Sequence, residues 1–417
     1  MDENYTRNIE LDLVDLAYDL EESDNYETII EFLKGEKFRS FGDSLVWLIK
    51  KNDKNADVTD STLKKYLEEK CKKNGVDLEK IGNRNTFKNW FGNTYPDKTA
   101  ENREKMFAIA FALELNVEEV KYLFHKVYFD RAFDYRNYKE SVYYYCILKG
   151  YNYERANRMI KVIEEREDKT SIEKIDSLSI AKKISDIKND DELIDWICSR
   201  WSEFQCDNKA AMENYEILFG KVRELAKEEY SIDIELKEEE KKKKEEKAKK
   251  KRKKINIHKK SVKFVYYVLF KYFPKPNEEK KYISIIKKGT NIHKEIKTNF
   301  PQTNTISGFC NKNSTKFENR EYEKLRKIIV LFYFYWFYSN ALKKINNIID
   351  SVEKGNAVRD YKDKFIVEIN DILNECGMCE LYIGNTYDFL FLLCAESETA
   401  IYTLRQIMLE LRGEKNE

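Results

Sequence analysis

The sequence predicts a nearly all-α protein, and three observations lead to this fold class. The 417 residues include only 13 Gly and 4 Pro, which are residues that turns between strands commonly need. Lys, Glu, Ile, Asn and Leu are the most frequent residues, and Lys, Glu and Leu are strong helix formers. Apolar residues also recur at helical spacing in many segments. The length allows two or three helical domains.

Residues 1–40 are expected to form an acidic helical arm. The segments "IELDLVDLAYDL" and "NYETIIEFL" have helical apolar periodicity, and residues 1–36 hold 12 acidic side chains against 2 basic ones. The chain begins with acidic residues where a secretory signal would be basic, so the expected compartment is the cytosol. The eight scattered Cys are then expected to be reduced thiols.

Residues 41–130 are expected to form a domain of five short helices. The predicted segments are 43–53, 60–75, "GNRNTFKNWFGN" (82–93), 99–115 and 116–129. Asp60 is predicted to cap the second helix, and Gly75 to end it. Asn116 is predicted to cap the fifth helix, whose first turn is acidic and suits the positive end of the helix dipole.

The third of these segments has an apolar and a polar face. Phe87, Trp90 and Phe91 supply the packing face that the second helix of a helix-turn-helix requires. The opposite face offers short polar and basic side chains, which suit base edges and phosphate oxygens. The predicted DNA contacts of this helix are Arg84, Asn85, Thr86, Lys88 and Asn89. The alternative is an ordinary solvated helix face.

The five-helix series resembles the lambda-repressor-like (Xre-type) helix-turn-helix domains of bacterial regulators over residues 41–129. The resemblance rests on "NRNTFKNWF" as the third helix and "REKMFAIAFALELNVEEVKYLF" as the fourth and fifth. It implies a DNA-binding domain. The second helix lacks the family's usual Gln and compact Ala-Gly turn, which leaves open a domain that keeps the fold without binding DNA. The overall layout also resembles proteins of mobile elements and accessory loci in Gram-positive bacteria.

Two further segments are expected before the C-terminal third. Residues 131–235 are predicted to be a helical connector without recognisable chemistry. Residues 236–256 are a charge run with Glu before Lys at i,i+4 spacing, typical of a solvated helix or linker. This run is either a spacer or a basic arm on phosphates. Its candidate contacts are Lys250, Lys251, Arg252 and Lys253.

The basic character extends beyond that run. Residues 241–330 carry 28 Lys and Arg against 8 Asp and Glu, although the whole chain has a net charge of only +1. Such a local surplus is typical of a region that binds a polyanion.

Residues 257–417 are predicted to form a C-terminal helical domain that echoes the first. The order "TISGFCNKN" then "KFENREYEKLRKIIVLFYFYWFY" repeats "TFKNWFGN" then "TAENREKMFAIAFALEL", and both contain "ENRE". If the echo is a duplication, residues 300–313 are a second recognition-type helix with Thr305 and Lys312 as DNA contacts. The alternative is chance similarity between helical, Glu-rich segments.

The segment "IIVLFYFYWFYSNAL" (328–342) raises the question of a membrane. Its apolar run is about a dozen residues long, whereas a spanning helix needs about 20. Its aromatic residues lie along the centre instead of at the ends, where membrane interfaces would place them. We expect a buried core helix and no membrane contact. If the helix is not core, it is the surface on which a homodimer would form.

No catalytic, metal or cofactor site is predicted. The CxxC "CGMC" (376–379) has no second pair to complete a zinc site, and the three His are far from it in sequence. No P-loop, GxSxG or HExxH motif occurs. A turn and a buried helix are predicted at "GNTYDFLF", with Asp388 as a cap.

The expected function is therefore that of a cytosolic, non-enzymatic DNA-binding regulator that binds duplex DNA. Charge reversal at Arg84 and Lys88 is expected to weaken binding more than reversal at Lys64 and Lys65. The alternative is a protein-interaction or effector component of a phage-defence or mobile-element system. In that case the acidic arm or the C-terminal domain binds a protein partner or covers the basic region.

Overall fold

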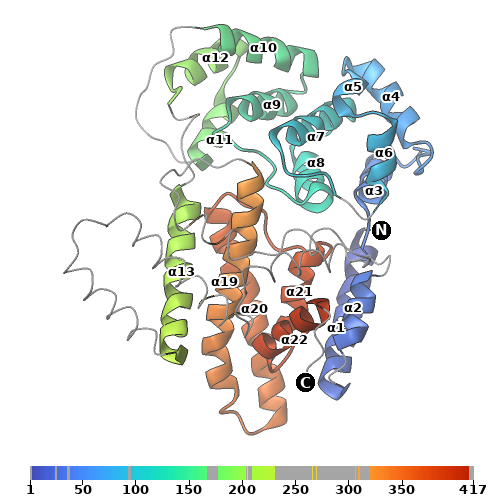
Figure 1. The fold of residues 1–417 in the computed structure, drawn as a ribbon. Coiled ribbons are helices and arrows are strands. Elements are labelled where there is room, and N and C mark those ends of the chain that lie inside the picture. The colour runs from blue at the N-terminus through green and yellow to red at the C-terminus, as the bar shows by residue number, and fades with distance from the viewer. Residues whose placement is uncertain are drawn as a thin grey trace, which may run out of the picture.

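The computed structural model describes residues 2–23, 26–34, 38–92, 95–166, 177–202, 204, 209–230 and 319–412, with the single residues 265, 269, 306 and 309. Every regular element in these ranges is a helix, which confirms the predicted all-α class. The helices form two bodies that lie one above the other in Figure 1. Each body has its own apolar core.

The first core lies among consecutive helices in the upper body of Figure 1. These are α3 (Phe41–Asn52), α4 (Leu63–Asn74), α5 (Leu78–Ile81), α6 (Arg84–Trp90), α7 (Ala100–Ala112), α8 (Val117–Tyr122), the π-helix η1 (Leu123–Tyr128), α9 (Tyr138–Lys149), α10 (Tyr153–Glu165), α11 (Ser177–Asp186) and α12 (Asp190–Ser199). The predicted connector thus shares a core, through its residues from 131 to 204, with the predicted helix-turn-helix domain.

The second core joins the two ends of the described chain. Its helices are α1 (Asp2–Ser23), α2 (Tyr26–Lys34), α13 (Lys209–Tyr230), α19 (Asn319–Ile345), α20 (Ser351–Glu375), α21 (Thr386–Ala395) and α22 (Ala400–Arg412). Ile9 and Leu13 of α1 and Ile29 and Leu33 of α2 are buried in it. Helix α1 packs on α21, and α2 packs on α22. The predicted acidic arm is therefore part of a core.

Helix α19 contains the long apolar segment and lies inside the second body (Figure 1). Its residues from Ile328 to Tyr335 are all buried, as expected for a core helix. No described helix is long and apolar enough to cross a membrane. Because these aromatic residues of α19 are buried in the core, they do not provide the predicted alternative surface for a homodimer.

Of the four helix ends predicted from single residues, two are observed and two are corrected. Gly75 ends α4 in the left-handed conformation, and Asn116 caps α8. Asp60 does not cap α4, which begins at Leu63, because a turn from Thr59 hydrogen-bonds the backbone there. Asp388 does not cap α21 either: Asn385 does, and Asp388 pairs with a buried arginine.

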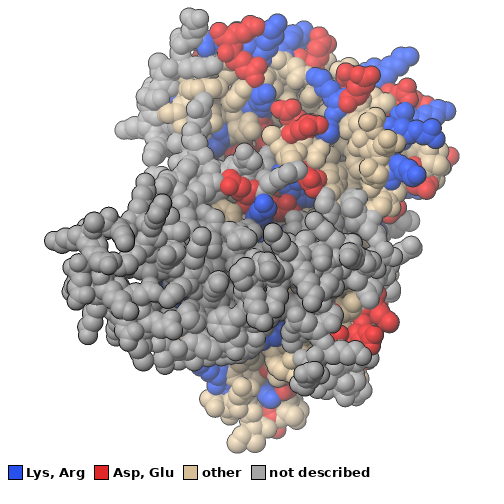
Figure 2. All heavy atoms as spheres, in the orientation of Figure 1, with Lys and Arg blue, Asp and Glu red and all other residues tan. Residues whose placement is uncertain are grey.

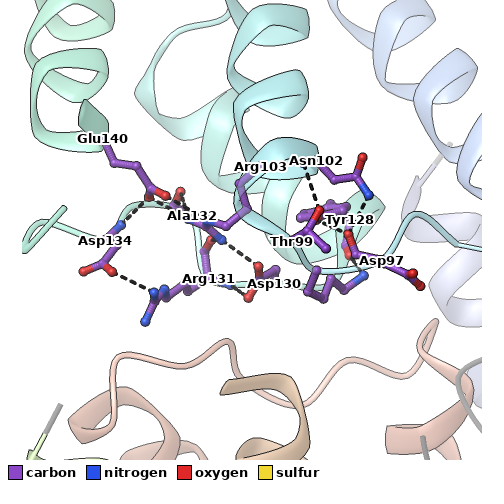
Figure 3. Close-up of polar contacts among 11 residues, drawn as sticks. Asp97, Thr99, Asn102, Arg103, Tyr128, Asp130, Arg131, Ala132, Asp134 and Glu140 are labelled. Atoms are coloured by element: carbon purple, nitrogen blue, oxygen red, sulfur yellow. Dashed lines mark hydrogen bonds and ion pairs between the residues drawn. The ribbon is translucent and has the colours of Figure 1, made fainter. Parts of the chain in front are cut away.

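That pairing belongs to one of two similar polar nodes. In the first, Arg103 of α7 is buried, and its Nε and Nη2 donate to the two oxygens of Glu140 at 2.8 and 2.7 Å. Nη1 donates to Asp130 at 2.6 Å, and the guanidinium also reaches the backbone oxygens of Arg131 and Ala132. Figure 3 shows this node between α7, α9 and the loop after η1.

In the second node, Arg326 of α19 holds Asp388 through two hydrogen bonds as well, but with the two terminal nitrogens of the guanidinium. Its Nη1 and Nη2 donate to the two carboxylate oxygens at 2.9 and 2.8 Å. Its Nε and Nη2 also donate to the backbone oxygens of Cys379 and Glu380, at 2.9 and 3.0 Å. Both carboxylates are the third residue of a buried helix, Glu140 in α9 and Asp388 in α21.

The helices around the two nodes pack in the same order. α9 packs on α10 as α21 does on α22, and α7 contacts α10 as α19 contacts α22. α11 and α12 then cover α9 and α10, whereas α1 and α2 cover α21 and α22. Helices α1 and α2 therefore contact α21 and α22 as α11 and α12 contact α9 and α10.

This likeness differs in register from the predicted echo, which stays a prediction. The nodes pair Arg103 with Arg326, whereas aligning the two "ENRE" strings pairs Arg103 with Arg320. The shared "ENRE" is thus not the structurally matched part. Of the predicted second recognition-type helix, only Ile306 and Phe309 are described, and both are buried.

Candidate nucleic-acid interface

The predicted recognition helix is the seven-residue helix α6. Asn83 caps it, accepting hydrogen bonds from the backbone N–H groups of Asn85 and Thr86 at 3.0 and 3.1 Å. Gly82 precedes the cap and lies against Thr86, since a Cβ on Gly82 would be 2.6 Å from Thr86 Cγ2. The entry to α6 is therefore fixed by an amide cap and by close packing.

The apolar face of α6 is in the first core, as predicted. Phe87 and Trp90 are buried, and their ring centroids are 4.8 Å apart. Trp90 also meets Phe41 of α3 at 4.9 Å. Phe91 is half-buried and covers Gly42, where a Cβ would be 2.7 Å from its ring. These contacts hold α6 against α3.

The opposite face of α6 is open to solvent. Arg84, Asn85, Lys88 and Asn89 are exposed, and Thr86 is half-buried. The structure therefore brings the five predicted residues of this helix together on one surface. The other predicted contacts, Lys250, Lys251, Arg252, Lys253, Thr305 and Lys312, lie outside the described residues.

A broad open hollow lies beside the start of α6. It has a volume of about 1130 Å³, and residues of α4, α5, α6, α7, α9 and α10 line it. Pockets for small molecules usually measure about 300–1,000 Å³. A hollow this large and open fits the surface of a macromolecule better than a small ligand.

The charges around the hollow are divided between its two sides. On the side of α4, α5 and α6, Lys64, Lys80 and Arg84 outnumber the single carboxylate of Glu79. On the side of α7, α9 and α10, three Lys are balanced by three Glu. On the side of α7 and α10, Lys139 lies 3.7 Å from Glu104 and 3.3 Å from Glu164, measured between Nζ and carboxylate oxygen. The cationic side is thus the one that continues into the exposed face of α6.

Two tyrosines lie at the side of the hollow opposite α6. Burial raises the pKa of Tyr143 well above its usual value, and burial is also the main cause of the raised pKa of Tyr153. Both hydroxyls therefore stay protonated at neutral pH and remain hydrogen-bond donors. Lys80 Nζ lies 5.4 Å from the centroid of the Tyr153 ring, which links the two sides.

The sequence did not single out Lys80, Tyr143 or Tyr153. The closeness of the two tyrosines to α6 depends on how α9 and α10 pack. Lys64, at which charge reversal is expected to have a smaller effect than at Arg84, lines the same hollow. The only sequence signal for Lys64 and Lys80 was the basic character of residues 62–92, with eight Lys and Arg against four Asp and Glu.

The described residues supply no competing metal or thiol site. No group of three or more His, Cys, Asp or Glu within them has the arrangement that a metal ion needs. Burial raises the pKa of Cys376 to about 12 and that of Cys379 to about 11. The CxxC is thus a pair of buried thiols with little thiolate, and thiolate is the reactive form.

Comparisons with known proteins give no further assignment, since no family model, curated protein or solved structure matches the chain. The geometry of α6 and its surroundings is therefore the basis for assigning a function.

Proposed function

We propose that the protein binds duplex DNA and acts as a cytosolic, non-enzymatic regulator. One observation carries the proposal: α6 buries Phe87 and Trp90 while it exposes Arg84, Asn85, Lys88 and Asn89 together. A helix that enters the major groove needs this division, because one face must hold the fold and the other must reach base edges.

The side chains on that face match the chemistry of DNA. An Asn amide pairs with an adenine edge through two hydrogen bonds, and an Arg guanidinium does so with guanine. Lys88 and the cations beside the hollow, Lys64 and Lys80, suit phosphate oxygens. In this proposal α6 contacts bases, and the cationic side of the hollow follows the DNA backbone.

A mobility-shift titration tests the proposal. The wild-type chain is titrated against a random 30-base-pair duplex at low and moderate salt, and affinity is expected to fall steeply as salt increases. The variant Arg84→Glu/Lys88→Glu should bind far more weakly and show a smaller salt slope. Its matched control is Lys182→Glu/Lys183→Glu on α11, which reverses two exposed charges away from the hollow.

The two variants make the outcome decisive. Equal weakening by both pairs would show that α6 has no special part and that only overall charge attracts DNA. Absence of binding by the wild-type chain at low salt would reject the proposal.

A second function has its own supporting observation. Four carboxylates, Glu79, Glu101, Glu104 and Glu164, line the same hollow and would repel phosphates. This favours the use of the helix-turn-helix-like unit as a protein-docking module, as in an effector of a defence or mobile-element system. In that case Arg84→Glu/Lys88→Glu would disrupt a protein complex, and the chain would not shift DNA.

A further inference from the structure

Helix α1 has apolar side chains on two opposite faces. One face, with Ile9, Leu13 and Leu16, is buried in the second core. The other face carries Leu11, Val14 and Tyr18, which are 56%, 55% and 60% exposed. The spacing of these three residues, i, i+3 and i+7, places them in one stripe along the helix. We call Leu11, Val14 and Tyr18 the outer stripe.

The corresponding helix of the first body has a polar outer face in its described residues. Helix α11 holds the matching place in the first body, since it packs on α9 as α1 packs on α21. Its described exposed residues are Lys182, Lys183 and Asp186. The same position is thus polar in one body and apolar in the other.

The charges beside the outer stripe determine which partner fits it. Glu10 and Asp15 flank it and are exposed, and residues 1–36 have 12 acidic side chains against 2 basic ones. Figure 2 shows acidic side chains at the right-hand edge, where Figure 1 places α1 and α2. Two copies of this face would repel each other, whereas a basic segment would be attracted.

We propose that the outer stripe of α1 is a docking surface for a basic amphipathic helix of a partner protein. The apolar residues of such a helix would cover Leu11, Val14 and Tyr18, and its Lys or Arg residues would face Glu10 and Asp15. Helix-on-helix recognition of this kind uses apolar anchors at i, i+3 and i+7 for affinity and the flanking charges for orientation. This surface is separate from α6 and does not depend on DNA binding.

The test uses the full chain and a defined probe. The probe is a fluorescein-labelled 18-residue peptide of Leu and Lys whose Leu residues lie on one helical face, and anisotropy measures its binding. The control peptide has the same composition in an order that scatters Leu around the helix. The variant Leu11→Ser/Val14→Ser/Tyr18→Ser removes the stripe and keeps every charge. Its matched control, Ile349→Ser/Val352→Ser, changes two residues that are 100% and 70% exposed elsewhere.

The expected result is binding of the amphipathic peptide by the wild type, at least tenfold weaker binding by the stripe variant, and no loss in the Ile349 and Val352 control. Circular dichroism should show the same helix content in all three proteins. Equal binding of both peptides, or equal binding by the stripe variant, would overturn the proposal in favour of charge alone. No binding by the wild type, or a wild-type dimer that the stripe substitutions dissociate, would overturn it as well.

Discussion

The substitution Arg103→Met examines what holds the first body together. Arg103 is 1% exposed, and it satisfies two carboxylates and two backbone oxygens. Methionine has a similar length and no charge, so the change leaves Glu140 and Asp130 without their cation. The side chains of these two residues are 6% and 12% exposed, so water does not replace the lost partner fully.

Removing one member of a buried ion pair costs about 3–5 kcal/mol, because the remaining charge is left uncompensated in a poorly solvated place. Exposed pairs contribute only about 0–1 kcal/mol. The matched control is Lys105→Met on the same helix, which breaks the pair with Glu101, a side chain that is 78% exposed. Urea unfolding followed by circular dichroism should show a large loss for Arg103→Met and a small one for Lys105→Met.

A second variant separates charge from packing. In Arg103→Met/Glu140→Gln, one uncompensated charge is gone, while the Gln carbonyl can still accept the backbone N–H of Asp134, which is 2.7 Å from the carboxylate in the wild type. This variant should recover part of the lost stability. The reasoning is refuted if Arg103→Met costs no more than Lys105→Met, or if adding Glu140→Gln makes the loss larger.

Three other predictions concern single sites. Gly82→Ala places Cβ 2.6 Å from Thr86 Cγ2 and should destabilise by about 1–3 kcal/mol in urea unfolding, whereas Gly220→Ala, with nothing within 4 Å, should not. Partial burial is the largest cause of the lowered pKa of His125. The imidazole therefore binds a proton more tightly in the unfolded chain than in the folded one. The free energy of unfolding consequently falls as pH drops below about 6.5. His125→Gln should reduce that loss in unfolding at about pH 5 relative to about pH 7, and an unchanged pH slope would contradict this. Both thiols of "CGMC" (376–379) are buried with raised pKa, so mass spectrometry should find them alkylated by iodoacetamide in urea but hardly in the native protein.

The helices themselves were predictable because local signals determine them. Apolar periodicity located the five predicted segments of residues 41–129 but missed the four-residue helix α5, and the fifth segment is α8 followed by the π-helix η1. Gly75 and Asn116 marked two helix ends correctly. Asp60 and Asp388 failed as caps for physical reasons that involve other residues. A turn from Thr59 starts α4, and a guanidinium 62 positions away in sequence takes the carboxylate of Asp388. Local sequence does not reveal a partner that is so far away along the chain.

Part of the candidate interface was also predictable from local signals. The division of α6 into a buried and an exposed face follows from spacing within one helix, and the structure has it as predicted. The hollow beside α6 depends on α9 and α10, which come more than 40 residues later. Lys80 and Tyr153 therefore have no sequence signal that links them, although their side chains lie near each other.

The largest difference between the predicted and the observed structure concerns the acidic N-terminal segment. This difference affects how a deletion of that segment would be interpreted. Its acidic composition predicted a separate helical arm. The charged residues, however, describe only the exposed face of these helices. Its buried face, with Ile29 and Leu33 in α2, is complementary to α21 and α22 at the other end of the chain. Since α11 and α12 cover α9 and α10 in the same way, α1 and α2 complete a second set of helices that would otherwise expose its core. Deleting residues 1–36 would therefore remove core residues along with the acidic surface. A loss of function in such a truncation reports on folding, and only substitutions on the exposed face of α1 separate recognition from stability.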